Sequence, residues 1–452
     1  MMHQPTPLPF AVRSRILSAC LALMISIIGA VWSPAIKAVA AEPDLKPGAI
    51  LLFLGDSNTF SGDYVAMLQT CLKIRHPDNT WQFINHGLPS EGVTGLTERD
   101  HPFPRPNVHE RLERALQKIK PDVVFACYGM NDGIYWPPGK DRQRAYEQGM
   151  EQLIHVVQQS GAKLILMTPP PFTGQELPSA LPAGAADYGY KTPYRDYDQV
   201  LQGYSTWLQN RARPDLPVVD LHQSLTRAWR EARQKKATVN LAGDGIHFDS
   251  AGHWLVAENV LETLRIVPLT TRVEYDASRR EVAQPDNAPR ATMPADLDIQ
   301  HTGPALRILY TAHPPFPQET TWSKELVPVA RAARWNAQII KITGLEPGKY
   351  NLCWNEQILS MVTHEELAAG INLDTYLDTP RQQTARELLK ICRQSSELQK
   401  LAWLSEVGHQ RPGIAAGLSL SEMREKCQSL TVEMNKLCQP GKIDLLIQPA
   451  KN

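Results

Sequence analysis

Short, mainly apolar runs alternate with longer amphipathic stretches over residues 49–266, and this alternation constrains the fold most. The apolar runs occupy 50–54, 81–85, 123–127, 164–167 and 218–219. Helical periodicity falls at 64–74, 109–119, 142–160, 196–212 and 250–265. Continuous apolar strands spaced by helical crossovers are typical of a parallel sheet that is covered on both faces. We therefore predict a doubly wound α/β sandwich with five parallel strands, whose ligands bind at the carboxyl ends of the strands.

The sequence changes character after residue 268, and 452 residues exceed what one hydrophobic core usually serves. Residues 276–304 are polar with little periodicity, so we expect 268–304 to be a linker or crossing segment. Strand-like runs at 306–311 and 337–343 follow, and a turn leads from the second into 349–353, which indicates a small antiparallel unit. Residues 379–438 read as two or three amphipathic helices. We expect 305–452 to form a C-terminal accessory region of mixed β and helical structure.

Residues 1–41 have the layout of a secretory signal peptide. Arg13 and Arg15 precede an apolar run from Ile16 to Trp32, which ends in the small residues of 38–41. An uncleaved membrane anchor is the alternative, but the short run and its Ala-rich exit favour cleavage. We therefore expect an exported protein, periplasmic or extracellular, with no stable membrane insertion after cleavage.

The charge balance and the cysteines limit the partners. Lys and Arg total 47 and Asp and Glu total 47, so the chain lacks the net charge that attracts nucleic acid or anionic membranes. No Cys/His spacing suggests zinc, and we expect no metal and no cofactor. In an oxidising compartment, Cys392, Cys427 and Cys438 are the candidates for one disulfide bridge. The oligomeric state stays open.

A serine lies directly after the first apolar run, in the motif Gly55-Asp56-Ser57-Asn58. A serine at a strand-to-helix turn can expose its hydroxyl in the strand-end crevice, which suits a nucleophile. Gly-Asp-Ser is also common turn chemistry, so this motif alone leaves both interpretations open.

Three further polar segments follow strand ends or precede the final helix. Asn85-His86-Gly87 and Gly129-Met130-Asn131-Asp132 could supply a glycine N–H and an asparagine amide to a developing oxyanion. In Asp244-Gly245-Ile246-His247, the carboxylate can reach back to orient the histidine as a base. Parallel strands deliver such turns to one edge of the sheet, so we expect these segments to converge.

The four segments together, in this order, resemble the SGNH (GDSL-type) hydrolases, and the resemblance covers about residues 49–266. It implies a flavodoxin-like five-stranded sheet in a hydrolase domain spanning 42–267, and ester hydrolysis through an acyl-serine. It further implies Ser57 as nucleophile, His247 as general base and Asp244 as its orienter. The implied oxyanion hole consists of the Ser57 and Gly87 backbone N–H groups with the Asn131 side chain.

Two positions depart from the family pattern. Asn58 stands where the motif has leucine, a variation that we expect not to affect the chemistry. In the second block, the next glycine after Gly87 is Gly92, five residues on instead of three, so we expect a longer loop there.

The family resemblance fixes the reaction more than the substrate. Tyr135, Trp136 and Tyr190 lie in or near long loops and could stack on sugar rings, although they could equally pin down a proline-rich loop. An acetyl ester of a carbohydrate is our leading substrate, and a lipid or lysophospholipid acyl ester is the alternative. A catalytically silent protein that binds glycans or partners is a hypothesis of another class.

Overall fold

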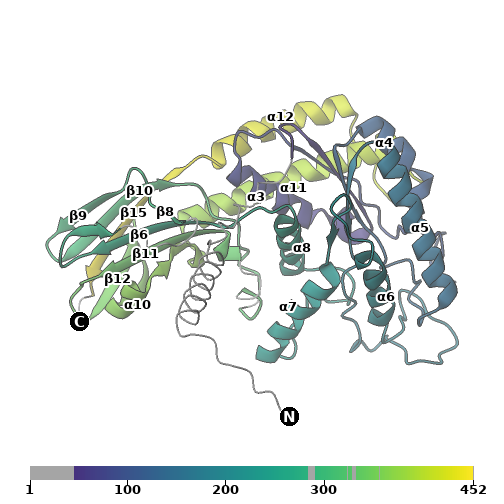
Figure 1. The fold of residues 1–452 in the computed structure, drawn as a ribbon, viewed down its shortest axis with the longest axis horizontal. Helices are drawn as coiled ribbons and strands as arrows, with labels where there is room; N and C mark the ends of the chain where they lie inside the picture. The colour runs from purple at the N-terminus through teal and green to yellow at the C-terminus, as the bar shows by residue number, and fades with distance from the viewer. Residues whose placement is uncertain (1–44, 284–290, 323, 328–331, 356, 451–452) are drawn as a thin grey trace, which may run out of the picture. The chain divides into compact units, whose positions relative to one another are not determined.

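A five-stranded, all-parallel sheet lies within residues 45–266 (Figure 1). Its strand order, β2-β1-β3-β4-β5, is flavodoxin-like and confirms the predicted fold class. The computed structural model describes residues 45–450 except 284–290, 323, 328–331 and 356, so the expected signal peptide at 1–41 lies outside the described residues. The strands are β1 (Ile50–Gly55), β2 (Gln82–Asn85), β3 (Val123–Cys127), β4 (Lys163–Met167) and β5 (Val218–Val219).

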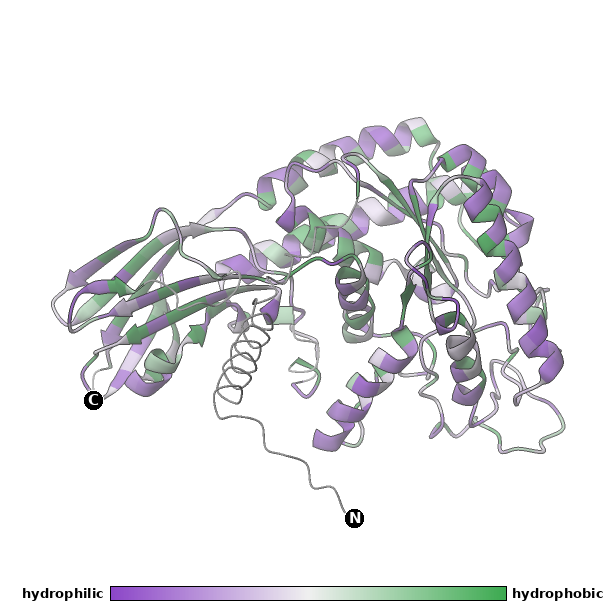
Figure 2. Cartoon of the chain, viewed as in Figure 1, coloured by the Kyte–Doolittle hydropathy of each residue, from purple (hydrophilic) through white to green (hydrophobic). Residues whose placement is uncertain are grey.

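Helices cover both faces of this sheet because successive strand residues point to opposite sides. Leu51 and Phe53 pack in the cluster of α3, α7 and α8, whereas Leu52 and Leu54 pack in that of α4, α5 and α6. Figure 2 shows hydrophilic residues along much of α5 and α7, away from the hydrophobic strands. The helices are α2 (Ser57–Ser61), α3 (Asp63–Arg75), η1 (Val108–Glu110), α4 (Leu112–Ile119), α5 (Lys140–Gln159), α6 (Asp198–Gln209), α7 (Leu221–Lys235) and α8 (Ser250–Thr263).

Helix α7 was not predicted from the sequence, although its local signals are present. Asp220 caps its amino terminus by accepting from the Gln223 N–H at 3.0 Å. Leu221, Leu225, Ala228 and Ala232 are buried at helical spacing and join the core beneath the sheet.

The segment 268–304, expected as a linker or crossing segment, instead contributes strands to two further sheets. Strand β6 pairs in parallel with β11, so its partner lies more than 60 residues away and leaves no local periodic signal. The strands in and after this segment are β6 (Leu269–Asp276), β7 (Glu281–Ala283), β8 (Ala291–Thr292), β9 (Asp298–Thr302), β10 (Ala305–Ala312), β11 (Asn336–Thr343), β12 (Lys349–Trp354), β13 (Gln357–Thr363), β14 (Ile371–Asn372) and β15 (Gly441–Pro449).

The expected antiparallel pairing of 337–343 with 349–353 is wrong. Strand β11 lies in the sheet β14-β11-β6-β7, with β8 beside β6, whereas β12 lies in the sheet β13-β12-β15-β10-β9. The turn between them carries the chain from one sheet to the other. Ile340 of β11 and Leu352 of β12 belong to one buried cluster, so the two sheets share a hydrophobic core. Short helical segments accompany them: η2 (Ala332–Arg334), α10 (His364–Ala369) and η3 (Leu373–Thr375).

Two helices, α11 (Pro380–Val407) and α12 (Leu420–Leu437), occupy the region where two or three were predicted. Helix α11 packs against α3 and β2. Leu388 and Cys392 of α11 are fully buried in the same cluster as the residues of α3 and α8. The described residues from 45 onwards consequently form one compact unit.

The remaining expectations concern cysteines, membranes and metals. The six cysteines within the described ranges are all free, so the structure does not form the bridge considered for Cys392, Cys427 and Cys438. Of the helices that the structure describes, none is long and apolar enough to cross a membrane. Among the same residues, no His, Cys, Asp and Glu side chains gather in groups of three suited to a metal ion.

Candidate active site

Ser57 is the first residue of helix α2, directly beyond the carboxyl end of β1. Asp56 caps this helix by accepting from the Asn58 N–H at 3.0 Å. Gly55 is required at the turn, because a Cβ there would come within 2.2 Å of Thr59 Oγ1. The Ser57 N–H is one of the amides at a helix start that lack an intrahelical partner, and no described residue accepts from it.

Ser57, His247 and Asp244 form a continuous hydrogen-bonded chain. His247 Nε2 lies 2.8 Å from Ser57 Oγ, and His247 Nδ1 lies 2.6 Å from Asp244 Oδ2. The side chains of His247 and Asp244 are each 54% exposed, so the histidine is open to solvent and to a ligand. The structure thus brings Ser57 to the Asp244–His247 pair, although Ser57 and His247 are 190 residues apart in sequence.

Asp244 organises the turn that carries the histidine. Its Oδ1 accepts the backbone N–H groups of Ile246 at 2.9 Å and of His247 at 2.7 Å. Gly245 adopts φ +80°, and a Cβ there would come within 2.4 Å of Gly174. One carboxylate therefore holds both the backbone and the ring of His247.

The hydrogen bond between the two side chains shifts both pKa values. Partial burial acts to raise the pKa of Asp244, but hydrogen bonds from the ring and backbone of His247 outweigh it and lower that pKa well below its usual range. The same bond to Asp244 raises the pKa of His247 above its ordinary value, against the effect of burial. Asp244 therefore stays ionised and stabilises the protonated imidazole.

Asn131 follows β3, the neighbour of β1 in the sheet, and its side-chain amide is oriented by its partners. Its Oδ1 accepts from Arg105 Nη1 at 2.9 Å and from the Tyr135 hydroxyl at 3.1 Å. Its Nδ2 donates to the Glu91 carbonyl at 3.0 Å. A guanidinium can only donate, so Nδ2 must face the opposite way, and its second hydrogen remains for another acceptor.

Gly87, named from the sequence as an oxyanion donor, has its backbone N–H already engaged. Its N–H donates to Asn85 Oδ1 at 2.9 Å, and a Cβ on Gly87 would come within 2.4 Å of Phe60 N. Gly92, the next glycine, also uses its N–H, donating to the Pro106 carbonyl at 3.1 Å. Of the three donors named from the sequence, the Ser57 N–H and Asn131 Nδ2 are the two left with donor capacity.

Sequence reasoning missed the buried ions that fix the loop between Gly87 and Gly92. Arg111 donates to both carboxylate oxygens of Glu91, at 2.7 and 2.6 Å, and the Tyr128 hydroxyl donates to Glu91 at 2.6 Å. Arg105 forms a second buried pair with Glu98. Glu91, the one charged residue inside this loop, was the available signal, because a charged side chain that is buried needs a partner.

The three loop aromatics have different environments. Tyr135 is only 2% exposed and its hydroxyl binds Asn131, so it cannot stack on a ligand as expected. Trp136 is half-buried and donates to the Tyr188 carbonyl at 2.9 Å. Tyr190 is also half-buried and packs edge-on against His101, whose Nε2 lies 3.3 Å from Ser90 Oγ.

The connection between α11 and α12 reaches the loop that carries Glu91. Arg411 Nε donates to the Pro89 carbonyl at 3.0 Å, and its guanidinium lies over the Phe103 ring, 5.1 Å from its centroid. Residues after 268 therefore contact the surroundings of the candidate site directly.

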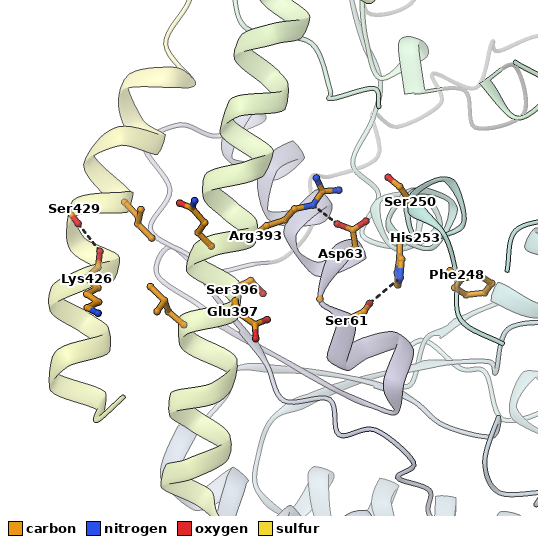
Figure 3. Close-up of a pocket in the computed structure, with 14 residues that line it drawn as sticks. Ser61, Asp63, Phe248, Ser250, His253, Arg393, Ser396, Glu397, Lys426 and Ser429 are labelled. Carbon is orange, nitrogen blue, oxygen red and sulfur yellow. Dashed lines mark hydrogen bonds and ion pairs between the residues drawn. The ribbon is translucent and has the colours of Figure 1, made fainter. Parts of the chain in front are cut away.

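A pocket of about 960 Å³ lies between α11 and α12 on one side and the start of α3 and α8 on the other (Figure 3). It contains a second serine–histidine pair, with His253 Nε2 at 3.1 Å from Ser61 Oγ. Ser61 donates its own proton to the Asn58 carbonyl at 2.8 Å, so it accepts from the histidine instead of being deprotonated by it. Burial lowers the pKa of His253 to about 4, and we assign this pair a structural role.

Two of three comparisons with known proteins find similar proteins. Residues 53–255 match the model of the GDSL-like Lipase/Acylhydrolase family. A search of curated protein sequences finds no match. The solved structure of a gut microbial diltiazem-metabolizing enzyme is similar in fold, with a TM-score of 0.68 and 18% identity over 91% of this chain and 99% of that one.

Smaller structures match only part of the chain. An acetylxylan esterase from Geobacillus stearothermophilus, studied as a catalytic mutant, has a TM-score of 0.36 and 22% identity over 49% of this chain and 95% of its own. A psychrotrophic esterase from Pseudoalteromonas sp. has a TM-score of 0.31 and 16% identity over 48% of this chain and 97% of its own.

Proposed function

Because residues 53–255 belong to the GDSL-like lipase/acylhydrolase family, we propose that this serine ester hydrolase acts through Ser57, His247 and Asp244. One observation carries the assignment of roles: the unbroken hydrogen-bonded chain from Ser57 Oγ through both ring nitrogens of His247 to Asp244. In this arrangement a base is hydrogen-bonded to the serine hydroxyl, and a carboxylate is hydrogen-bonded to the base, as acyl transfer to a serine requires.

The reaction proceeds in two steps. Ser57 Oγ attacks the ester carbonyl while His247 Nε2 takes its proton, and His247 then gives that proton to the departing alcohol, leaving an acyl-serine. Water attacks the acyl group with His247 again as base, which releases the acid and restores Ser57. The negative charge on the carbonyl oxygen is bound by the Ser57 N–H and Asn131 Nδ2, which have donor capacity to spare.

An acetyl ester of a carbohydrate is the substrate that we favour, hydrolysed by an exported enzyme in the periplasm or outside the cell. Half-buried aromatic rings of Phe103, Trp136 and Tyr190 lie on loops linked to the site and suit stacking on sugars. A lipase would present a broad aliphatic surface. The large apolar side chains that are exposed in the described part of the chain all lie beyond residue 268: Leu269, Val282, Ile358, Met361 and Val432.

Hydrolysis of p-nitrophenyl acetate by the wild type and by Ser57→Ala tests the proposal. Loss of the nucleophile should lower kcat by about 10⁴–10⁶. Ser61→Ala, in the same helix and also beside a histidine, is the matched control and should retain activity. Equal rates for the wild type and Ser57→Ala would instead favour a catalytically silent binding protein.

A panel of acetylated oligosaccharides and of short- and medium-chain acyl esters tests the substrate class. Higher kcat/KM for the acetylated sugars supports the carbohydrate proposal. Preference for the longer acyl chains would favour the lipid alternative.

A further inference from the structure

Asn58 follows the proposed nucleophile, and both polar atoms of its buried side chain bind the loop that carries the proposed base. Nδ2 donates to the Ile246 carbonyl at 2.9 Å, and Oδ1 accepts the Phe248 N–H at 3.1 Å. A carbonyl only accepts and a backbone N–H only donates, so these partners fix the orientation of the amide. Asn58 therefore binds the residue on each side of His247.

This contact matters because packing does little to hold the His247 ring, whose side chain is about half exposed. Asp244 lies in the same turn as His247, so it orients the ring within the loop but does not tie the loop to helix α2. Within the described ranges, the hydrogen bonds that join α2 to residues 244–248 are the two from Asn58 and the Ser57–His247 bond itself.

The geometry points to Asn58 as a positioning residue that holds the 244–248 loop against α2 and so keeps His247 Nε2 within reach of Ser57 Oγ. This inference rests on the proposed function of the same site. Leucine, the residue at this position of the GDSL motif, is similar in size to asparagine, but its side chain offers neither a hydrogen-bond donor nor an acceptor. This proposed role of Asn58 differs from our expectation from the sequence, in which the change from leucine does not affect the chemistry.

Asn58→Leu is the direct test, with p-nitrophenyl acetate as substrate. Misplacing a catalytic group by about 1 Å costs on the order of 10²-fold, so we expect kcat to fall by roughly that factor while KM stays the same. The acidic midpoint of kcat/KM should not move, because the Asp244–His247 pair lies wholly within the loop. The rate at which a fluorophosphonate labels Ser57 should fall in parallel with kcat.

Two further variants keep the test decisive. Asn58→Asp keeps an acceptor for the Phe248 N–H but loses the donor to Ile246, so its kcat should be intermediate, and it replaces Asn58→Leu if that variant does not fold. Asn259→Leu is the control, because its amide donates only to the Leu255 carbonyl within α8.

A lower melting temperature with wild-type kcat, measured well below that temperature, would overturn the inference and leave Asn58 a structural role only. Wild-type kcat in a folded Asn58→Asp would overturn it too. An inactive wild type would instead contradict the proposed function, so the two failures are distinguishable.

Discussion

Arg105 donates from Nη1 to Asn131 Oδ1 at 2.9 Å, although 26 residues separate the two in sequence. Arg105 is itself buried and held by Glu98, to which Nε donates at 2.7 Å. A cation bound to the amide oxygen polarises the amide and makes its N–H groups stronger donors. The proposed oxyanion donor is therefore oriented and strengthened by a side chain that contacts neither Ser57 nor His247 in the described hydrogen bonds.

We expect Arg105→Ala and Asn131→Ala to lower kcat through the same interaction. Loss of one oxyanion donor costs about 10²–10³ in kcat. Loss of a hydrogen bond to a charged group, worth about 1.5–3 kcal/mol, corresponds to roughly 10–10². The double variant should be no slower than Asn131→Ala alone, as kcat for p-nitrophenyl acetate would show. If the losses in kcat of the two single variants multiply in the double variant, Arg105 does not act through Asn131. Arg144→Ala, which breaks an exposed ion pair, is the control and should retain the wild-type kcat.

Activity should fall at acidic pH with a midpoint above the ordinary histidine value of 6.5. The bond to Asp244 raises the pKa of His247, and only the neutral ring can accept the Ser57 proton, so kcat/KM rises as pH rises through that pKa. Asp244→Asn should move the midpoint to lower pH and lower kcat by up to about 10⁴. A flat profile down to about pH 4 would contradict the role of His247.

Breaking the buried Glu91–Arg111 pair should destabilise the fold. Both side chains are 1% exposed or less, so Glu91→Gln leaves an uncompensated buried charge on Arg111. We expect the free energy of unfolding to fall by about 3–5 kcal/mol in urea denaturation. Glu110→Gln, which breaks the partly exposed pair with Arg114, should cost about 0.5 kcal/mol or less. Equal losses from the two variants would contradict this account.

Helix α11 should be required for the stability of the parallel-sheet region. Leu388 of α11 is fully buried in the same cluster as residues of α3 and α8. Leu388→Ala should therefore lower the free energy of unfolding by about 2–5 kcal/mol with kcat unchanged. A chain ending at residue 267 would expose this core and should aggregate on expression. Val432→Ala, at a position 67% exposed on α12, is the control. A stable, active truncated protein would show that the C-terminal region is dispensable.

The sequence by itself determined the parallel sheet and the residues of the proposed triad. Runs such as Ile50–Leu54 are apolar because both faces of the strand are buried, and this pattern is visible locally. Ser57 and His247 lie at a strand end and before the last helix, where the topology of the sheet brings turns to one edge. The local apolar pattern was therefore sufficient for the sheet, and the four motifs together, through the family resemblance, for the residues of the proposed triad.

Only the tertiary structure decided which groups surround the triad and how the second half of the chain is built. The Gly87 N–H is already bound to Asn85, and β6 pairs with a strand far along the chain. Asn58 binds the His247 loop across nearly 190 residues. Hydrogen bonds between distant segments leave no periodic signal in the sequence, because they depend on how the packed elements bring individual donors and acceptors together.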